Sequence, residues 1–573
     1  MNFEHDSELK DDTSSSDKNN ANEKETSERL SSDQPTGQSG PIPPDAHEDE
    51  AQYPSLLVLV PLTFALMISI FMIALDTNII GTAIPKIVTQ FHSLNDVGWY
   101  GSAYLLTLMS FQPTYGRFYT HFNIKWLFIS ALAIFEVGST ICATATSSKL
   151  LITGRAISGM GASGIFSGGL TISHGLVRPK IRPLYISIVT SVYGIAAIAG
   201  PLLGGVFTDS ERLTWRFCFF LNLPFGGLAI LIVALQYKVP PRPQPELSIR
   251  QKLKHMDFLG AVLLLGAMTC LLLALKDGGI NSPWSNSKNW GCILGFGIMI
   301  FCFLTVEFKL KDGQVLAKSS VHHNYMMLTH CTRAMIPFRI ASQRTVAASC
   351  LFTVFVNMAI DTHIYYLPIY FQAVRGTTAE QSGIRMLPYL GSNILATIVS
   401  GASVSRFGYY VPFMWMCGII FTAGCGVLHT LGRFSTTAQW AGYEVLTGFG
   451  FGIGFQVPYT AVQIVLPTED VPIGNSLPVF SQALGGALAI SIAQNILTNT
   501  LSQELKMIPG LDSSEIIALG AKNLTSTVPS EYLDGVLDAY TYALSRTLIL
   551  PIAAAGMAFV CSLGMEWRKV EKK

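Results

Sequence analysis

The sequence predicts an all-α polytopic membrane protein with fourteen membrane-spanning helices. Half of the 573 residues are apolar and only 13% are charged, and the mean hydropathy is +0.40. A water-soluble globule of this composition would aggregate, whereas a bilayer also buries the outer face of a protein. The net charge of +1 gives nucleic-acid binding no electrostatic support, so we expect no nucleic-acid partner.

The first 52 residues differ from the rest of the chain. They are rich in Ser, Asp, Glu, Lys and Asn and contain no long apolar run. Such a composition cannot bury enough apolar surface to fold, so we predict a disordered cytoplasmic tail over residues 1–52. No cleavable signal peptide is recognised, and we expect the first apolar segment to direct membrane insertion.

Runs of about twenty apolar residues mark the expected helices, because that length crosses the hydrocarbon core of a bilayer. Each run ends in a polar, glycine-containing or proline-containing loop. We expect the first eight helices at residues 56–80, 98–116, 126–146, 150–172, 184–207, 217–236, 257–275 and 290–308, and the other six at residues 346–371, 386–404, 411–431, 441–464, 475–499 and 545–565.

Lysine and arginine gather in alternate loops. One side holds Arg117, Lys125, Arg178, Lys180, Arg182, Lys238, Arg242, Arg250, Lys252, Lys254, Lys309, Lys311, Arg339 and Arg344, and the end of the chain adds Arg568, Lys569, Lys572 and Lys573. The opposite loops are poorer in basic residues. Because cytoplasmic loops carry this excess, we expect both termini in the cytoplasm. The plasma membrane is the expected location, and the vacuolar membrane is the alternative.

The segment 500–544 then forms a long outer loop. It contains the sequence Asn523-Leu-Thr525, which is an acceptor sequence for N-linked glycosylation. We therefore predict that Asn523 is glycosylated.

Two pairs of segments resemble each other and indicate a duplicated plan. Gly116-Arg-Phe-Tyr-Thr-His-Phe-Asn123 joins the second and third predicted helices, and Gly401-Ala-Ser-Val-Ser-Arg-Phe-Gly408 joins the tenth and eleventh. Similarly, Leu151-Ile-Thr-Gly-Arg-Ala-Ile-Ser-Gly-Met-Gly161 in the fourth resembles Val445-Leu-Thr-Gly-Phe-Gly-Phe-Gly-Ile-Gly454 in the twelfth. Duplicated helical bundles with a site between them are typical of secondary transporters. We expect a six-helix bundle at 53–237, two inserted helices at 238–310, a cytoplasmic loop at 311–345, a second six-helix bundle at 346–566 and a tail at 567–573.

Five motifs, in order along the chain, carry a family resemblance. They are Leu75-Asp-Thr-Asn-Ile-Ile-Gly-Thr-Ala-Ile-Pro85, Gly154-Arg155 through Gly161, Tyr193 through Gly205, Trp215 through Pro224, and Tyr366 through Gln372. Together they resemble the major facilitator superfamily, specifically its fourteen-span drug:proton antiporter subgroup and the fungal toxin and multidrug efflux pumps. The resemblance implies the major facilitator fold, with two inserted helices. Thr120 and Ser405 stand where the family usually has an acidic residue, which puts a charge-based latch in that loop in doubt.

The fifth predicted helix is rich in glycine and contains a proline. Glycine allows another helix to approach closely, and proline removes a backbone hydrogen bond. We therefore predict a conformational role for Gly194, Gly200, Pro201, Gly204 and Gly205.

Two charged residues are the candidates for proton coupling. Arg155 lies inside the fourth predicted helix, where an unpaired guanidinium is costly, so it should face the bundle interior. The resemblance implies proton coupling for Arg155, and the alternative is a structural arginine near the membrane face. Asp76, if buried, could exchange protons near neutral pH; at the outer interface it would merely end the apolar run.

Four further ionisable residues lie within apolar segments: Glu136, Glu444, Asp361 and His363. They could relay protons or meet a cationic substrate, and interfacial placement or a hydrogen bond to a neighbouring helix explains them equally well. Asp361 and His363 are two positions apart, so they lie on different sides of a helix and do not form a direct pair.

Amide side chains within the predicted helices could line a large cavity of low specificity. The candidates are Gln112, Asn222, Asn357, Gln456 and Gln482. Amides and aromatic rings accommodate flat organic molecules by stacking and adaptable hydrogen bonds. The alternative is that these residues hold helices together.

Residues 315–333 interrupt the loop before the second bundle. We hypothesise that this segment is a retained intron translated in frame, and the alternative is a genuine loop insertion. Sequencing of the spliced transcript distinguishes the two.

These observations predict a transporter and not an enzyme. No GxxxxGK[ST] motif is present, so we expect no nucleotide, and we expect no other cofactor and no metal. The predicted function is efflux of an amphipathic organic compound in exchange for protons, by a monomer in the lipid bilayer. The alternatives are proton-driven uptake of an iron chelate or basic amino acid, and a transporter-like nutrient receptor.

Overall fold

The computed structural model describes residues 53–93, 96–210, 212–239, 248–254, 256–278, 284–310, 333–509 and 528–570. The predicted tail at 1–52, residues 315–332 of the hypothesised insertion and the sequon at Asn523 lie outside these residues.

The described chain is helical. Its first part contains α1 (Leu56–Phe91), α2 (Val97–His121), α3 (Ile124–Ala143), α4 (Ser148–Leu176), α5 (Arg182–Asp209), α6 (Phe217–Phe220), α7 (Asn222–Gln236), α8 (Ile249–Lys254), α9 (Phe258–Asp277) and α10 (Ser287–Leu310). The second part contains α11 (Phe338–Ala341), α12 (Arg344–Ile369), the π-helix η3 (Tyr370–Val374), α13 (Ala379–Arg385), α14 (Leu387–Phe407), α15 (Val411–His429), α16 (Thr437–Phe455), α17 (Val457–Val465), α18 (Val471–Leu505), α21 (Ser530–Thr547) and α22 (Ile549–Ser562).

Twelve helical segments in the described part of the chain are long and apolar enough to cross a membrane. The predicted spans 98–116 and 150–172 correspond to α2 and α4, which are not among the twelve. These helices have 25 and 29 residues, so they are long enough, but they are rich in Gly, Ser, Thr and Tyr. Most of α4 is buried against other helices and not exposed to lipid. The count of fourteen spans therefore stays a prediction.

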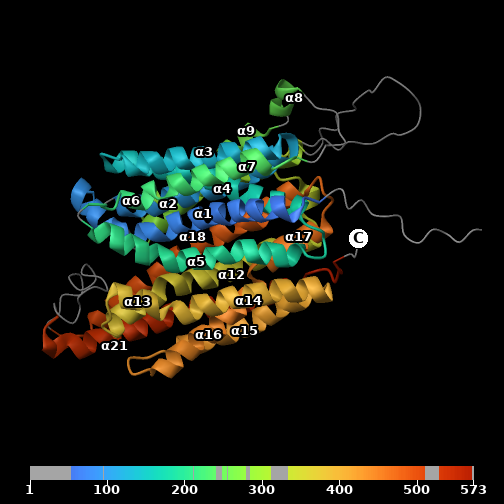
Figure 1. Cartoon of the computed structure of the whole chain (residues 1–573). Coiled ribbons are helices and arrows are strands. Elements are labelled where there is room, and N and C mark those ends of the chain that lie inside the picture. Colours follow the sequence, from blue (N-terminus) through green and yellow to red (C-terminus); the bar gives the residue numbers. More distant parts are fainter. Residues whose placement is uncertain are drawn as a thin grey trace, which may run out of the picture. The chain divides into compact units, whose positions relative to one another are not determined.

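The long helices pack in two groups. In the first group, α1 packs against α5 and α7, and α4 packs against α2 and α3. In the second group, α12 packs against α18 and α22, while α16 packs against α14 and α15, which lie beside it in Figure 1. The groups meet mainly where α5 packs against α14 and α2 against α18. Helices α9 and α10 pack on each other, and α9 also contacts α2.

The structure differs from the expected outer loop at 500–544. Helix α18 continues to Leu505, and α21 begins at Ser530, so both ends of this segment are helical. The mean apolarity of α21 is low because only one face is apolar, and a search for continuous apolar runs misses such a helix. Val536, Tyr540 and Ala543 on that face are buried in the core of the second group.

Described residues on the two sides of the hypothesised insertion contact each other. The carboxylate of Glu307, one turn before the end of α10, accepts hydrogen bonds from the backbone N–H groups of Met335 at 3.0 Å and Ile336 at 3.2 Å. Both the intron and the loop-insertion hypotheses allow this contact.

Candidate functional site

Asp76 and Arg155 form an ion pair inside the first group of helices. Nη1 of Arg155 lies 2.5 Å from Oδ2 of Asp76, and the two side chains are only 1% and 0% exposed. Asp76 comes from the middle of α1 and Arg155 from the second turn of α4. Asp76 therefore lies deep in the protein and does not merely end an apolar run at an interface.

Other groups also contact the side chain of Arg155. Its Nε donates to the backbone carbonyl of Tyr100 at 2.8 Å. Its guanidinium carbon lies 4.4 Å from the centre of the Tyr104 ring and 6.0 Å from that of Phe219. A cation on an aromatic face is stabilised by the ring quadrupole. The arginine is thus held by one carboxylate, one carbonyl and two rings.

Asn222 holds the second oxygen of the carboxylate. Its Nδ2 lies 3.5 Å from Oδ1 of Asp76 and 3.2 Å from the hydroxyl oxygen of Ser139 on α3. The structure therefore places Asn222 inside the first group, beside the ion pair, and not in a cavity between the two groups as we expected. Sequence reasoning missed Ser139, because a single serine in an apolar helix carries no distinguishing signal.

Glu136 lies one turn before Ser139 on α3. Both of its carboxylate oxygens are buried, and neither has a hydrogen-bond partner in the described part of the chain. Gly226, one turn after Asn222 on α7, makes room for this carboxylate, because a Cβ at Gly226 would overlap Glu136 Oε1. A second carboxylate thus lies one turn from Ser139, outside the hydrogen bonds that connect Ser139, Asn222 and Asp76.

Glycines of α4 bring these groups together. A Cβ at Gly159 would overlap the carbonyl oxygen of Tyr104 on α2, and a Cβ at Gly161 would overlap the backbone nitrogen of Phe135 on α3. With no side chain at these positions, α4 lies directly against both backbones. This close packing explains why the Arg155 side chain reaches α1.

The glycines of α5 face both groups of helices. A Cβ at Gly194 would lie 2.7 Å from Ile394 on α14, and one at Gly200 would lie 2.7 Å from Asn78 on α1. A Cβ at Gly204 would overlap Thr82 on α1, whereas Gly205 has open space around it. Pro201 lies inside α5 and cannot donate a backbone hydrogen bond. Helix α5 therefore packs closely between α1 and α14.

Four of the predicted cavity residues make hydrogen bonds within the protein. Gln112 accepts a hydrogen bond from Ser167, Asn357 donates to its own helix at Thr353 O over 2.9 Å, Gln456 accepts from Thr460 at 3.0 Å, and Gln482 accepts from Tyr459 at 2.6 Å. A pocket of 470 Å³ opens elsewhere, between α18, α21 and α22, and none of the five predicted residues lines it.

Aromatic rings meet where α4 and α5 contact the second group. The ring centres of Phe166 and Tyr459 are 6.2 Å apart, and those of Tyr193 and Phe455 are 6.4 Å apart. Gln482 binds the hydroxyl of Tyr459 at this boundary. An amide and aromatic boundary between the groups is thus present, although only Gln482 of the predicted residues contacts it directly.

A serine hydroxyl connects the two groups at the N-terminal end of α5. The hydroxyl oxygen of Ser405 on α14 accepts a hydrogen bond from the backbone N–H of Leu184, in the first turn of α5, at 3.1 Å. A Cβ at Gly401 would overlap Ser187 of α5. Thr120, the other position where an acidic residue is usual, donates to the carbonyl of Arg117 at 2.6 Å. Ser405 therefore connects the groups without a carboxylate.

A segment before α11 adds further contacts at α2. On α2, Arg117 Nε donates to the carbonyl of Ala334 at 2.8 Å. Nearby in the sequence, Arg339 of α11 makes a bidentate ion pair with Asp470, the residue before α18, at 2.5 and 2.7 Å. A Cβ at Gly116 on α2 would lie 2.6 Å from the hydroxyl of Ser476 on α18. The α2–α18 crossing is thus as close as the α5–α14 crossing.

Comparison with known proteins gives one consistent family. The model of the Major Facilitator Superfamily matches residues 66–490. The chain is 44% identical to the MFS-type transporter ltbE of Aspergillus luteorubrus, over 89% of this chain and 90% of that protein. It is 38% identical to the efflux pump aflT of Aspergillus parasiticus, over 92% of this chain and 99% of that protein. It is also 38% identical to the MFS-type efflux pump MFS1 of Trichophyton rubrum, over 90% and 93%.

Solved structures share the fold. The proton:xylose symporter XylE superposes with a TM-score of 0.52 at 14% sequence identity, over 87% of this chain and 94% of that chain. The human organic anion transporter MFSD10 superposes with the same TM-score at 12% identity, over 87% and 99%.

Proposed function

The chain belongs to the Major Facilitator Superfamily, and we propose that it exports an amphipathic organic compound across the plasma membrane in exchange for protons. The relatives named as efflux pumps support the direction of transport. The observation that carries the proton coupling is the buried ion pair of Asp76 and Arg155. The compound would be a toxin, a secondary metabolite or a drug.

Protonation of Asp76 changes the net charge of a buried site. With Asp76 ionised, its charge and that of Arg155 cancel. Once Asp76 is protonated, the guanidinium is left uncompensated away from water, which is strongly unfavourable. A conformation that lets water reach Arg155 is then favoured, so proton binding and a conformational change are linked. Glu136, one turn from Ser139 on α3, would exchange protons with this pair once water enters, because its own oxygens have no hydrogen-bond partner among the described residues.

The inward proton gradient supplies the work for export. The membrane potential contributes about 2.3 kcal/mol for each charge moved through 100 mV. We propose that both termini are cytoplasmic, so that Ser405 and Arg117 lie at the cytoplasmic end. The hydrogen bonds there would hold that end closed while cargo leaves on the opposite side.

The cargo would bind at the aromatic and amide boundary between the two groups. Tyr193, Phe455, Phe166 and Tyr459 offer flat apolar faces, and Gln482 offers an adaptable hydrogen bond. Such a surface binds flat amphipathic compounds without strict shape selection. Motion of α5 about Gly200 and Pro201 would open and close this boundary.

Accumulation of labelled compounds in an efflux-deficient yeast strain tests the proposal. A panel of labelled amphipathic compounds is measured in cells with and without the chain, before and after addition of a proton uncoupler. A proton-driven exporter lowers accumulation, and the uncoupler restores it. An uncoupler that lowers accumulation identifies an importer, and no difference for any compound argues for a receptor.

A further inference from the structure

The second group of helices also contains a buried carboxylate, that of Glu444, which has no role in the site described above. Glu444, on α16, has no exposed surface. Both of its carboxylate oxygens lack a hydrogen-bond partner among the described residues. An ionised carboxylate in such surroundings costs several kcal/mol, so it requires a proton or a partner.

Glycine contacts relate α16 to α4. Gly159 of α4 lies against the carbonyl of Tyr104 on α2, and Gly448 of α16 lies against the carbonyl of Tyr389 on α14. Each glycine also faces a hydroxyl group one turn after that tyrosine. The two crossings are therefore equivalent in the two groups.

A second contact two residues later gives the same alignment. Gly161 lies against the backbone nitrogen of Phe135 on α3, and Gly450 lies 2.6 Å from the backbone nitrogen of Phe421 on α15, measured from the Cβ that an alanine would carry. Four residues before the first glycine of each pair stand Arg155 in α4 and Glu444 in α16. In the second group, a carboxylate thus occupies the place that the coupling arginine has in the first.

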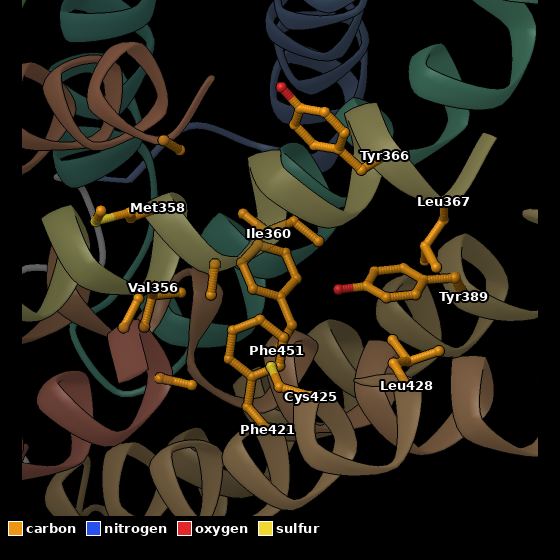
Figure 2. Packing of buried hydrophobic residues seen from close by; sticks show 14 of the residues in the cluster. Val356, Met358, Ile360, Tyr366, Leu367, Tyr389, Phe421, Cys425, Leu428 and Phe451 are labelled. Carbon is orange, nitrogen blue, oxygen red and sulfur yellow. The ribbon is translucent and has the colours of Figure 1, made fainter. Parts of the chain in front are cut away.

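The surroundings of Glu444 are polar at only a few points. The backbone N–H of Tyr389 approaches the carboxylate but does not reach hydrogen-bond geometry. The Tyr389 hydroxyl lies 3.2 Å from Nδ1 of His363, and Nε2 of the same buried imidazole has no partner in the described chain. Figure 2 shows Tyr389 among apolar side chains, including Phe421 and Leu367.

Other titratable or charged groups on the neighbouring helices are placed less directly. Arg385, at the end of α13, stacks over Trp440 at 5.6 Å, one turn before Glu444 on α16, and its Nη1 is buried without a partner among the described residues. Cys425 faces Tyr389 from α15. Asp361 on α12 points to Gly486 of α18. No cation is in contact with Glu444 in this conformation within the described residues.

We propose that Glu444 is a second proton-binding site, which rests on the proposed function and adds a site in the other half of the transporter. Glu444 holds a proton while its surroundings are closed. It releases the proton when a conformational change brings water or the guanidinium of Arg385 to the carboxylate. Tyr389 and His363 hydrogen-bond to each other and not to the carboxyl, and these polar groups influence the proton affinity of Glu444 from nearby.

Infrared difference spectroscopy on the purified full-length protein tests the site without any cargo. Spectra are recorded while pH is changed, and the probe is the proton itself. We expect the C=O band of protonated carboxyl groups to contain one component that titrates and that disappears completely in Glu444→Gln. Glu444→Met removes the same component and serves if the first variant does not fold. A spectrum unchanged by both substitutions, or a Glu444 component that never titrates, overturns the proposal.

Two tyrosine variants test whether the surroundings act as described. Tyr389→Phe removes the hydroxyl beside His363 and should shift the titration of the Glu444 component. Tyr366→Phe is the matched control, because Tyr366 is also buried but its hydroxyl donates to Gln494 at 3.1 Å. The Tyr366→Phe substitution should leave the Glu444 component unchanged. If Tyr389→Phe and Tyr366→Phe shift the titration of the Glu444 component equally, Tyr389 has no specific influence on that carboxyl.

The test separates this proposal from the first one. Asp76→Asn should remove a different component of the carboxyl band and leave that of Glu444. If only the Glu444 component titrates, the second site stands and the coupling role of Asp76 fails. If only the Asp76 component titrates, the second site fails and the proposed function is untouched.

Discussion

Removal of one member of the Asp76–Arg155 pair should destabilise the protein much more than removal of both. Arg155→Met leaves Asp76 buried with only the weak contact to Asn222, and Asp76→Asn leaves a guanidinium with 1% exposure. Breaking a buried pair from one side typically costs about 3–5 kcal/mol, because an uncompensated charge remains. Replacing both members with neutral residues of similar volume is often neutral or stabilising.

The assay combines stability with transport. Unfolding of the purified wild-type protein, both single variants and the Asp76→Asn/Arg155→Met double variant is measured in detergent micelles. Export is measured with the uncoupler assay described above. We expect the single variants to lose about 3–5 kcal/mol of stability and the double variant to recover most of it. All three variants should have lost proton-driven export.

The double variant decides between coupling and a purely structural role. If it is stable and exports cargo at the wild-type rate with full sensitivity to the uncoupler, the pair only holds α1 and α4 together. If the single variants are as stable as the wild type, the burial and pairing of the two charges do not matter to the fold, and the reasoning fails at an earlier step. Surface expression of Arg155→Ala alone cannot separate these cases, because it leaves Asp76 without its partner.

Three further predictions use neighbouring positions as controls. Gly204→Ala forces α5 away from α1 and should lower the free energy of unfolding by about 1–3 kcal/mol, measured by thermal unfolding. Gly205→Ala is the control, because open space surrounds Gly205, and it should be neutral or stabilising. Equal effects of the two substitutions contradict the packing argument. Gly226→Ala places a methyl group against the Glu136 carboxylate and should reduce both stability and export, whereas the control Gly227→Ala should reduce neither. A fully active Gly226→Ala variant excludes a tightly packed Glu136 carboxylate. Ser405→Ala removes one hydrogen bond between α14 and α5, worth about 0.5–1.5 kcal/mol. The open state at the N-terminal end of α5 should then be favoured up to about tenfold, measured by spin-label distances across the α5–α14 crossing. An unchanged distance distribution argues against a latch at Ser405.

The membrane fold was predictable because most helices carry their own signal. A run such as residues 411–431 is apolar throughout, and the structure has α15 at Val411–His429. Helix α21 had no such signal, because its apolar face is only part of its surface and the partners of that face lie on other elements, α18 and the distant η3. The extension of α18 to Leu505 depends on the same packing.

The candidate site was predictable by residue type and not by geometry. A charge in an apolar helix identified Asp76 and Arg155, since such residues are rare in membranes. The contact between them depends on glycines that allow α4 to approach α2 and α3, and no local pattern specifies where these crossings fall. Asn222 was misplaced for the same reason, because an amide in an apolar helix satisfies its hydrogen bonds equally well within a bundle or at its surface.

The internal repeat gives the clearest case of what sequence comparison alone misses. The shared Thr-Gly pair aligns Gly154 with Gly448, whereas the helix crossings align Gly159 with Gly448. The first alignment rests on two identical residues within similar segments. The second follows positions where a side chain would collide with a neighbouring backbone, which is the stronger constraint on how helices pack.

That second alignment bears on how two halves of one transporter could share the proton work. The site of Asp76 and Arg155 is neutral when both groups are ionised. Glu444 has no hydrogen-bond partner among the described residues, so its site is neutral only when Glu444 carries a proton. The two sites would therefore reach electrical neutrality in opposite ways, one by losing a proton from Asp76 and the other by keeping one on Glu444. A single conformational change that opens both sites to water would then release a proton from Glu444 and allow a proton to bind at Asp76. The net number of protons transported depends on which side of the membrane each site faces at that moment. Counting protons per cargo molecule in the wild type and in Glu444→Gln measures this directly, because the substitution removes one site and leaves the other.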